Sequence, residues 1–338
     1  MPRDISGAST YRKGVENRTL TWRALTTEDA GALTRAYAAV EAVDHTGEHY
    51  SEQDVRDELE DESIDLRRDT LAALAPEGEL VAFAWVHGSV EVHDLDRIDA
   101  EGAVVPAARG RGLGRRLLEW AEERAASLHT ERHPDIPGAV CVDVHENNPA
   151  KQALVQAAGY EATRWWYRMA RNLDDPLSDV PPTPPGLTLA PYTADRDEAV
   201  RQAHREAFAG HWGATPPDEQ RWSQRYTGTQ TFRPDVSWLV LNGEEVAAYL
   251  LTSFWEADAA ATGVREAFVG QLGVRPAWRR RGLGGLLLAT ALESYRAAGY
   301  ERSVLTVDTG NATGALRLYE RAGYAVKDTS VVWTKPLG

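Results

Sequence analysis

Residues 279–285 read Arg279-Arg280-Arg281-Gly282-Leu283-Gly284-Gly285, and this stretch decides how the rest of the chain is interpreted. It lies between an apolar run, Phe268 to Val274, and a run typical of a helix, Leu286 to Ala298. The order predicts a strand, a turn rich in arginine and glycine, and a helix whose first amides are unpaired. Free N–H groups at a helix N-terminus, the helix dipole and the close approach that glycine permits all suit a phosphate. We therefore expect an anion site, to which the arginines add charge-assisted contacts.

Two familiar phosphate-binding motifs do not fit this stretch. A P-loop needs Lys-Ser/Thr after its last glycine, whereas Gly284 is followed by Gly285 and Leu286. The dinucleotide-binding fingerprint needs three glycines in a different spacing. A turn rich in arginine and glycine that only caps a helix is the alternative interpretation, and the stretch alone does not exclude it.

The same pattern occurs much earlier in the chain, and the pieces that follow it are repeated in the same order. Arg109-Gly110-Arg111-Gly112-Leu113-Gly114 follows a short apolar run that ends at Pro106 and precedes a helical run, Leu117 to Leu128. The later pieces are an apolar run, an Asn-led segment and Ala-Gly-Tyr: Val140 to Val144, Asn148-Pro149-Ala150 and Ala158-Gly159-Tyr160 in the first copy, and Val304 to Val307, Asn311-Ala312-Thr313 and Ala322-Gly323-Tyr324 in the second. An ordered series present twice indicates a duplicated domain.

Arg-x-x-Gly-x-Gly between a strand and a helix resembles the acyl-CoA loop of the GCN5-related N-acetyltransferases. Its duplication resembles the tandem members of that family, which include mycothiol synthase. The resemblance implies an α/β fold with two tandem domains, each a mixed, mostly antiparallel sheet with splayed central strands flanked by helices. It also implies direct transfer of acetyl from acetyl-CoA to a primary amine of a small molecule, without a metal. A protein or peptide N-acetyltransferase and a non-catalytic acyl-CoA sensor are the alternatives.

The resemblance implies that only the second copy is catalytic. Tyr319, four residues before Gly323, matches the family's tyrosine that protonates the leaving thiolate of CoA, whereas Val155 holds that position in the first copy. An aromatic residue on the core side of a helix is the other interpretation of Tyr319. We expect the first copy to be degenerate, either binding CoA or serving as a scaffold.

The predicted contacts to acyl-CoA follow from the same resemblance. A main-chain N–H near Leu272 to Val274 would polarise the thioester carbonyl, and Asn311 matches the asparagine that orients the pantetheine arm. The full set is Leu272, Gly273, Val274, Arg279, Arg280, Arg281, Gly282, Leu283, Gly284, Gly285 and Asn311, with Arg109, Gly112 and Gly114 in the first copy.

The acceptor side of the site is less well defined by the sequence. Glu266 is our candidate for the base that takes a proton from the substrate ammonium, although a solvated glutamate at a strand end fits as well. Gln271 could orient the substrate but cannot be a base. The candidate substrate contacts lie where the family usually lines its acceptor pocket, and packing on the core is their alternative: His211, Trp212 and Trp222.

Composition and charge set the boundaries of the prediction. A chain of 338 residues with 43% hydrophobic content can bury two cores, at ~150 residues a domain. We expect a polar tail over 1–17, a first domain over 18–173, a proline-rich linker over 174–186 and a second domain over 187–338. The net charge of −14 argues against a nucleic-acid partner. No run has the length of a membrane span and no leader is recognisable, so we expect a cytoplasmic protein. We also expect a monomer or a weak homodimer.

A few local features complete the prediction. Cys141, the single cysteine, is expected to be buried and inert, because it lies within a predicted strand. His45 and His49 are interpreted as surface histidines and not as metal ligands, since no third ligand has a suitable spacing. The acidic segment Glu91 to Glu101 predicts a short or irregular fourth strand in the first domain. The linker prolines favour an extended spacer, with direct packing of the domains left open.

Overall fold

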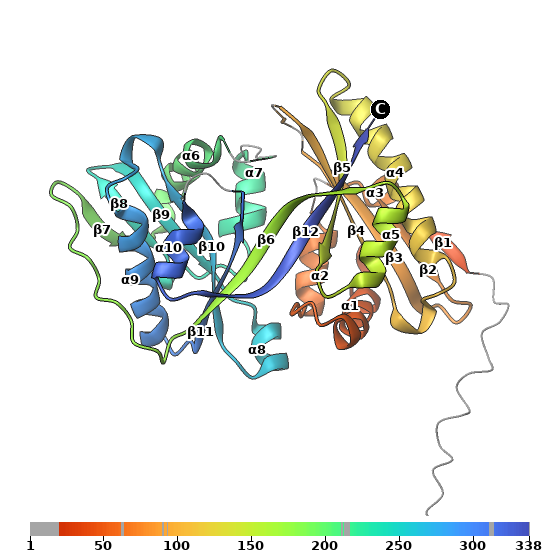
Figure 1. Ribbon diagram of the computed structural model, residues 1–338, viewed down its shortest axis with the longest axis horizontal. Coiled ribbons are helices and arrows are strands. Elements are labelled where there is room, and N and C mark those ends of the chain that lie inside the picture. The colour runs from red at the N-terminus through yellow and green to blue at the C-terminus, as the bar shows by residue number, and fades with distance from the viewer. Residues whose placement is uncertain are drawn as a thin grey trace, which may run out of the picture.

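The computed structural model describes residues 20–61, 64–89, 91–92, 94–210, 212, 217–310 and 314–337. The strands form one 12-stranded sheet in the order β1-β2-β3-β4-β5-β12-β6-β11-β10-β9-β8-β7. Helices cover this sheet in two lobes (Figure 1). We call the elements from β1 to α5 the first half and those from β7 to α10 the second half; β6 and β12 run between the two lobes.

The first half follows the predicted alternation of strands and helices. Its elements, with the strand that leaves it, are β1 (Thr21–Arg23), α1 (Ala30–Asp44), α2 (Glu52–Leu59), α3 (Leu66–Asp69), β2 (Thr70–Leu74), β3 (Leu80–Gly88), β4 (Asp96–Val104), α4 (Leu113–Arg132), β5 (Gly138–His145), α5 (Pro149–Ala157) and β6 (Glu161–Asn172). The expectation of a short or irregular fourth strand is wrong. β4 has nine residues and pairs with β3 without a register shift, because Asp96, Ile98 and Ala100 alternate on its buried face.

The second half repeats this order, except that it has no α-helix directly before its second strand and has one between its third and fourth strands. Its elements are β7 (Thr188–Pro191), α6 (Asp197–Phe208), α7 (Glu219–Trp222), β8 (Trp238–Asn242), β9 (Glu245–Ser253), α8 (Glu256–Thr262), β10 (Glu266–Val274), α9 (Leu283–Ala297), β11 (Arg302–Asp308), α10 (Ala315–Arg321) and β12 (Ala325–Leu337). One-turn helices at Thr27–Asp29, Pro106–Ala108, Ala194–Arg196, Ser223–Thr227, Pro234–Val236 and Pro276–Trp278 complete the secondary structure.

In each half two neighbouring parallel strands pair at their beginning and then separate. β4 pairs with β5 only over 96–99, and β10 pairs with β11 only over 266–268. Beyond these positions β4 continues to pair with β3, and β10 with β9. The predicted splayed strands are therefore present twice. β10 also has a register shift between Val269 and Gln271, a bulge that β4 lacks.

The last strand of each half lies in the sheet of the other half. β6 leaves the first half and pairs with β11, where Ala170 lies opposite Val304. β12 leaves the second half and pairs with β5, where Thr334 lies opposite Cys141. β6 and β12 also pair with each other, so the exchange joins the two sheets into one (Figure 1). Residues 174–186, the expected linker, connect β6 to β7 and contain no helix or strand.

Each half has its own apolar core between the sheet and its helices. In the second half α9 contributes more buried residues to this core than any other element, Leu283, Leu286 and Leu287 among them. Cys141 on β5 is 1% exposed, as expected. Burial raises the pKa of its thiol to about 12, which keeps it protonated and inert at neutral pH. Within the described part of the chain, no helix combines the length and the apolar character needed to cross a membrane.

Candidate active site

Both Arg/Gly stretches form turns between a strand and a long helix, as predicted. We call residues 109–114 the first loop and residues 279–285 the second loop. Gly112 (φ 78°, ψ 2°) precedes α4 and Gly282 (φ 78°, ψ 4°) precedes α9, so the two turns have nearly the same backbone. A Cβ atom at either glycine would meet no atom within 4 Å. Glycine is needed there because the positive φ is costly for other residues, and both cradles face open space.

The helix after the fifth strand packs on each loop in the same way. A Cβ atom at Gly284 would lie 3.3 Å from Leu318 on α10, and one at Gly114 would lie 3.2 Å from Leu154 on α5. Both glycines therefore allow a close approach between the loop and this helix. Since Tyr319 follows Leu318 and Val155 follows Leu154, the contact places these two residues at equivalent positions, as the repeat predicts.

Tyr319 lies on α10, at the edge of the core of the second half. Its side chain is 8% exposed, and its ring contacts Tyr324 edge to face with centroids 5.9 Å apart. Among the residues that the structure describes, none forms a hydrogen bond with its hydroxyl. Burial raises the pKa of Tyr319 to about 12, so the phenol keeps its proton at neutral pH and can donate it.

The predicted thioester-polarising segment lies where β10 has separated from β11. Leu272, Gly273 and Val274 pair with β9 on one side. Because antiparallel pairing uses alternate N–H groups, the remaining ones along β10 face the gap left by β11. Gly273 must be a glycine, since a Cβ atom there would lie 2.6 Å from the Tyr249 hydroxyl oxygen. This hydroxyl is 2.7 Å from Nδ1 of buried His204, a pair that the motif analysis did not find.

The arginines of the second loop have no carboxylate partner among the described residues. Arg279 donates to the main-chain oxygens of Val274 and Ala207, at 3.3 and 2.9 Å. Arg280 has a positive φ of 62°, and the guanidinium of Arg281 lies 4.6 Å from the Trp278 ring centroid. These cations remain available to an anionic ligand.

Arg109 of the first loop, in contrast, is already paired. Its guanidinium donates two hydrogen bonds to the carboxylate of Asp44, at 2.7 and 2.8 Å. Asp44 also accepts a hydrogen bond at 3.1 Å from Asn148, which leads α5 as Asn311 leads the corresponding segment of the second copy. Nothing in the sequence motifs indicated this contact, because Asp44 belongs to neither repeat motif.

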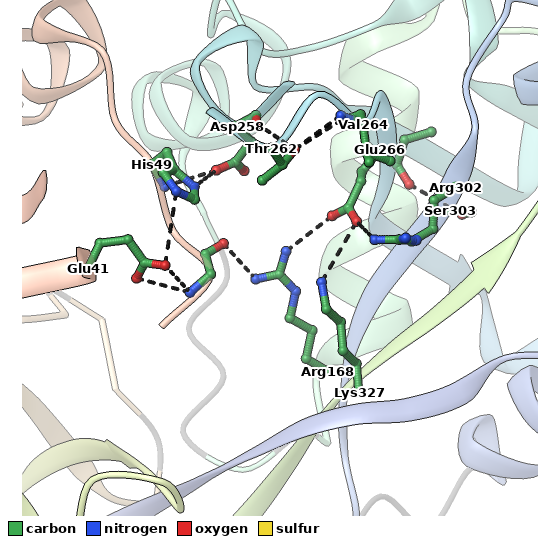
Figure 2. A network of polar contacts seen from close by, with 12 residues as sticks. Glu41, His49, Arg168, Asp258, Thr262, Val264, Glu266, Arg302, Ser303 and Lys327 are labelled. Atoms are coloured by element: carbon green, nitrogen blue, oxygen red, sulfur yellow. Dashed lines mark hydrogen bonds and ion pairs between the residues drawn. The ribbon is translucent and has the colours of Figure 1, made fainter. Parts of the chain in front are cut away.

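Glu266 is the first residue of β10, at the end of the strand far from the loop. Its carboxylate lies 2.5 Å from Arg302, 3.3 Å from Arg168 and 3.8 Å from Lys327 (Figure 2). Gln271 lies beyond the bulge and is half-buried. Glu266 and Gly270 are four residues apart on β10, so their Cα atoms are separated by about 13 Å at 3.3 Å per strand residue.

The candidate substrate contacts do not form one group. Trp222 is 1% exposed and its indole N–H donates to Asp197 at 2.9 Å, so it has no free surface for a ligand. Trp212 packs on the sheet of the first half, with the guanidinium groups of Arg97 and Arg164 at 4.8 and 5.0 Å from its ring centroid. His211 and Asn311 lie outside the described residues.

The connection between α1 and α2 contacts the second half beside β10. The main-chain N–H and Nδ1 of His49 are both 2.9 Å from the same carboxylate oxygen of Asp258 on α8 (Figure 2). Arg168, the partner of Glu266, also donates to the main-chain oxygen of Gly47 at 2.9 Å. His49 is therefore a contact between the halves, which corrects its interpretation as a surface histidine. The α1–α2 connection therefore joins the first half to α8 and, through Arg168, to the start of β10.

Two family models match the chain, each in one half. The model described as the acetyltransferase (GNAT) family matches residues 198–324, and the one described as an acetyltransferase (GNAT) domain matches residues 68–162. The mycothiol acetyltransferase of Saccharopolyspora erythraea is 31% identical over 75% of this chain and 81% of its own length. That of Frankia alni is 29% identical over 93% of this chain and 94% of its own length.

Solved structures agree with this relationship over nearly the whole chain. A GCN5-related N-acetyltransferase from Sphaerobacter thermophilus is 27% identical, with a TM-score of 0.72 and coverage of 94% of this chain and 96% of its own. A tandem GNAT protein from the clavulanic acid biosynthesis pathway, at 18% identity, shares the fold with a TM-score of 0.71, over 95% of this chain and 99% of its own. The two loops, the twice-splayed strands and these relatives lead to one conclusion: the chain belongs to the GNAT family as a tandem, two-domain N-acetyltransferase.

Proposed function

We propose that the second half transfers the acetyl group of acetyl-CoA to the primary amine of a small molecule by direct attack in a ternary complex. The observation that supports this most is the difference at two equivalent positions. Tyr319 offers a buried, protonated phenol without a hydrogen-bond partner among the described residues, whereas Val155 offers no proton. The first half serves as a scaffold in this proposal.

The parts of the second half divide the work of the reaction. The amides of residues 280–285, with Arg279, would hold the pyrophosphate at the start of α9. The pantetheine arm would lie between β10 and β11 where these strands have separated. A free N–H of Leu272 to Val274 would polarise the thioester carbonyl and stabilise the oxyanion that forms on attack.

Proton transfers complete the reaction. The ammonium of the acceptor first loses a proton to the base, and the neutral amine then attacks the carbonyl carbon. The tetrahedral intermediate collapses with cleavage of the C–S bond, the thiolate takes the proton of Tyr319, and the second proton lost by the amine nitrogen restores the phenol as the amide forms. We keep Glu266 as the base. Its ion pairs and its place at the start of β10 hold it away from the thioester, so it would take the proton through a water molecule.

A small-molecule acceptor is supported by the relatives of this chain. The relatives are mycothiol acetyltransferases, and this similarity supports a small molecule as the acceptor. In this chain the α1–α2 connection docks on α8, and Trp212 docks on the opposite sheet. The exchanged strands join both domains in one chain, so we propose that it acts as a monomer.

The proposal is tested with a matched pair of loop variants. Gly112→Glu and Gly282→Glu each place a carboxylate and a strained backbone in one cradle, at positions of equal φ and equal free space. Acetyl-CoA binding is measured by titration calorimetry, and CoA release is measured with a panel of small amines. We expect Gly282→Glu to lose binding and turnover and Gly112→Glu to keep both. Loss of turnover with Gly112→Glu alone would contradict the assignment of catalysis to the second half.

A further inference from the structure

The two loops differ in the side chain that lies against their first arginine. Among the described residues Arg279 of the second loop donates to main-chain oxygens and to no carboxylate, and the corresponding helix α6 ends at Phe208. In the first loop α1 extends to Asp44, whose carboxylate accepts two of the three hydrogen bonds that the Arg109 guanidinium donates; the third goes to the main-chain oxygen of Val104. A carboxylate that takes both donors in this way makes the contact that two phosphate oxygens would make.

Asp44 also occupies the other end of the first cradle. Asn148 donates its side-chain amide to Asp44 at 3.1 Å, and Asn147 donates to the main-chain oxygen of Asp44 at 3.2 Å. One residue therefore connects the loop after β4 with the segment before α5, across the gap between the splayed strands. The side chain of Asp44 is only 12% exposed, although that of Arg109 is 36% exposed.

Asp44 does not owe its position to helix stability. It is the last residue of α1, where the negative end of the helix dipole disfavours a carboxylate. The chain after it is fixed by other contacts: Glu41 accepts hydrogen bonds from the Thr46 hydroxyl and the Gly47 amide, and Arg168 donates to Gly47. The backbone thus holds Asp44 against Arg109 independently of any ligand.

We propose that Asp44 is a specificity residue that excludes acyl-CoA from the first half and so confines the cosubstrate to the second. The carboxylate competes with the pyrophosphate for Arg109 and repels it, while the backbone of the cradle is otherwise that of the second loop. This inference rests on the proposed function insofar as the second loop is taken as the acyl-CoA site.

The test is the number of acetyl-CoA sites on the full chain, measured by titration calorimetry. We expect one site in the wild type and two in Asp44→Asn, which keeps the size of the side chain and removes its charge. Asp44→Asn with Gly112→Glu should return to one site, which locates the new site at the first loop. Asp44→Asn with Gly282→Glu should retain only the new site.

The control is Glu122→Gln. It removes one carboxylate from α4, the helix of the first loop, where Glu122 pairs with Lys335 at 2.8 Å away from the cradle. We expect it to keep one site, so that a general loss of negative charge cannot explain a gain. Thermal unfolding of each variant shows whether it is folded, and Asp44→Ala replaces Asp44→Asn if the latter is not.

Each outcome decides a different claim. A wild type with two sites, or an Asp44→Asn chain with one site that Gly282→Glu removes, would overturn the role of Asp44. A wild type without any site would overturn the proposed function. In that case the role of Asp44 still stands if Asp44→Asn gains a site that Gly112→Glu removes, and it falls if Asp44→Asn gains none.

Discussion

In both halves a strand ends, a glycine with φ of 78° turns the chain and a long helix begins, yet the two turns face different side chains. In the first loop Arg109 pairs with Asp44, and Val155 holds the position equivalent to Tyr319; in the second loop the arginines have no carboxylate partner among the described residues. The backbone that we propose to bind an anion is thus common to both copies. Under the proposed function, a few side chains and not the fold decide which copy performs chemistry.

The strands beside the loops differ as well. β4 pairs with β3 in continuous register, while β10 has a bulge between Val269 and Gln271. Bulges re-aim side chains and main-chain groups next to active sites. The bulge lies in the half that has the tyrosine, so the geometry and the residue types differ in the same half.

The largest effect is expected on turnover, from removal of the Tyr319 hydroxyl. Tyr319→Phe leaves the ring in the core and removes the proton donor, so we expect kcat to fall by about 10²- to 10⁴-fold with unchanged acetyl-CoA binding. Steady-state CoA release and calorimetry measure the two quantities. The reciprocal change Val155→Tyr should add no activity. Wild-type turnover in Tyr319→Phe would make the protein's tyrosine a core residue only.

The close packing behind β10 gives the next largest effect. Gly273→Ala places a methyl group against the Tyr249 ring, whereas the first half has Ala103 at the equivalent place. We expect a loss of about 1–3 kcal/mol in the free energy of unfolding, measured with urea. The control is Gly270→Ala on the same strand, where a Cβ atom would lie at an ordinary 3.5 Å from the Ser253 hydroxyl. Equal stability of the two variants would contradict the packing argument.

The dependence of stability on alkaline pH tests the burial of Tyr319, which has Val155 as its counterpart in the first half. The pKa of Tyr319 is raised from 10.0 to about 12 in the folded chain by burial. A raised pKa contributes stability that is present below pH 10 and is lost as pH rises through 12, by about 2 kcal/mol. Urea unfolding at pH 9 and pH 12 should therefore show a smaller loss for Tyr319→Phe than for the wild type. Equal losses of unfolding free energy in the two chains would contradict the burial of the phenol.

The smallest effect concerns the two loops themselves. Arg280 (φ 62°) has the positive φ that Gly110 (φ 77°) has in the first loop. Arg280→Gly should raise the free energy of unfolding by less than about 1 kcal/mol, because relief of strain is partly offset by a more flexible unfolded chain. Gly110→Arg should lower it by about 1–2 kcal/mol. Both are measured by urea unfolding without ligand, and a stable Gly110→Arg chain would show that the turns differ in strain.

Much of this architecture is readable from local patterns. The bounds of β10, Glu266–Val274, follow from its apolar run, and the turn at Asn242-Gly243 indicates the hairpin of β8 and β9. Both loops are found by their glycines because a positive φ leaves few other residues possible. α8 was not predicted, although its run of alanines favours a helix.

Other features depend on contacts that a local pattern does not encode. The alternation of β6 and β12 predicts strands but not which strands they pair with, so the exchange was not foreseen. Trp222 was a candidate substrate contact because of its place in the chain, with packing on the core as the alternative; it lies in the core, and its indole N–H donates to Asp197. The contact of Asp44 with Arg109 and that of Arg168 with Glu266 join residues far apart in sequence, without a motif.

The exchange of β6 and β12 has a consequence for how the chain is made. β5 in the first half has no neighbour on its outer side until β12, the C-terminal strand, pairs with it. During synthesis the N-terminal half therefore keeps an open and apolar sheet edge until residues 330–337, which pair with β5, have left the ribosome. Such an edge is a template for aggregation and such a distant pairing is slow to form. Nascent chains that stall before residue 325 should thus depend on chaperones, although their whole N-terminal half has been translated.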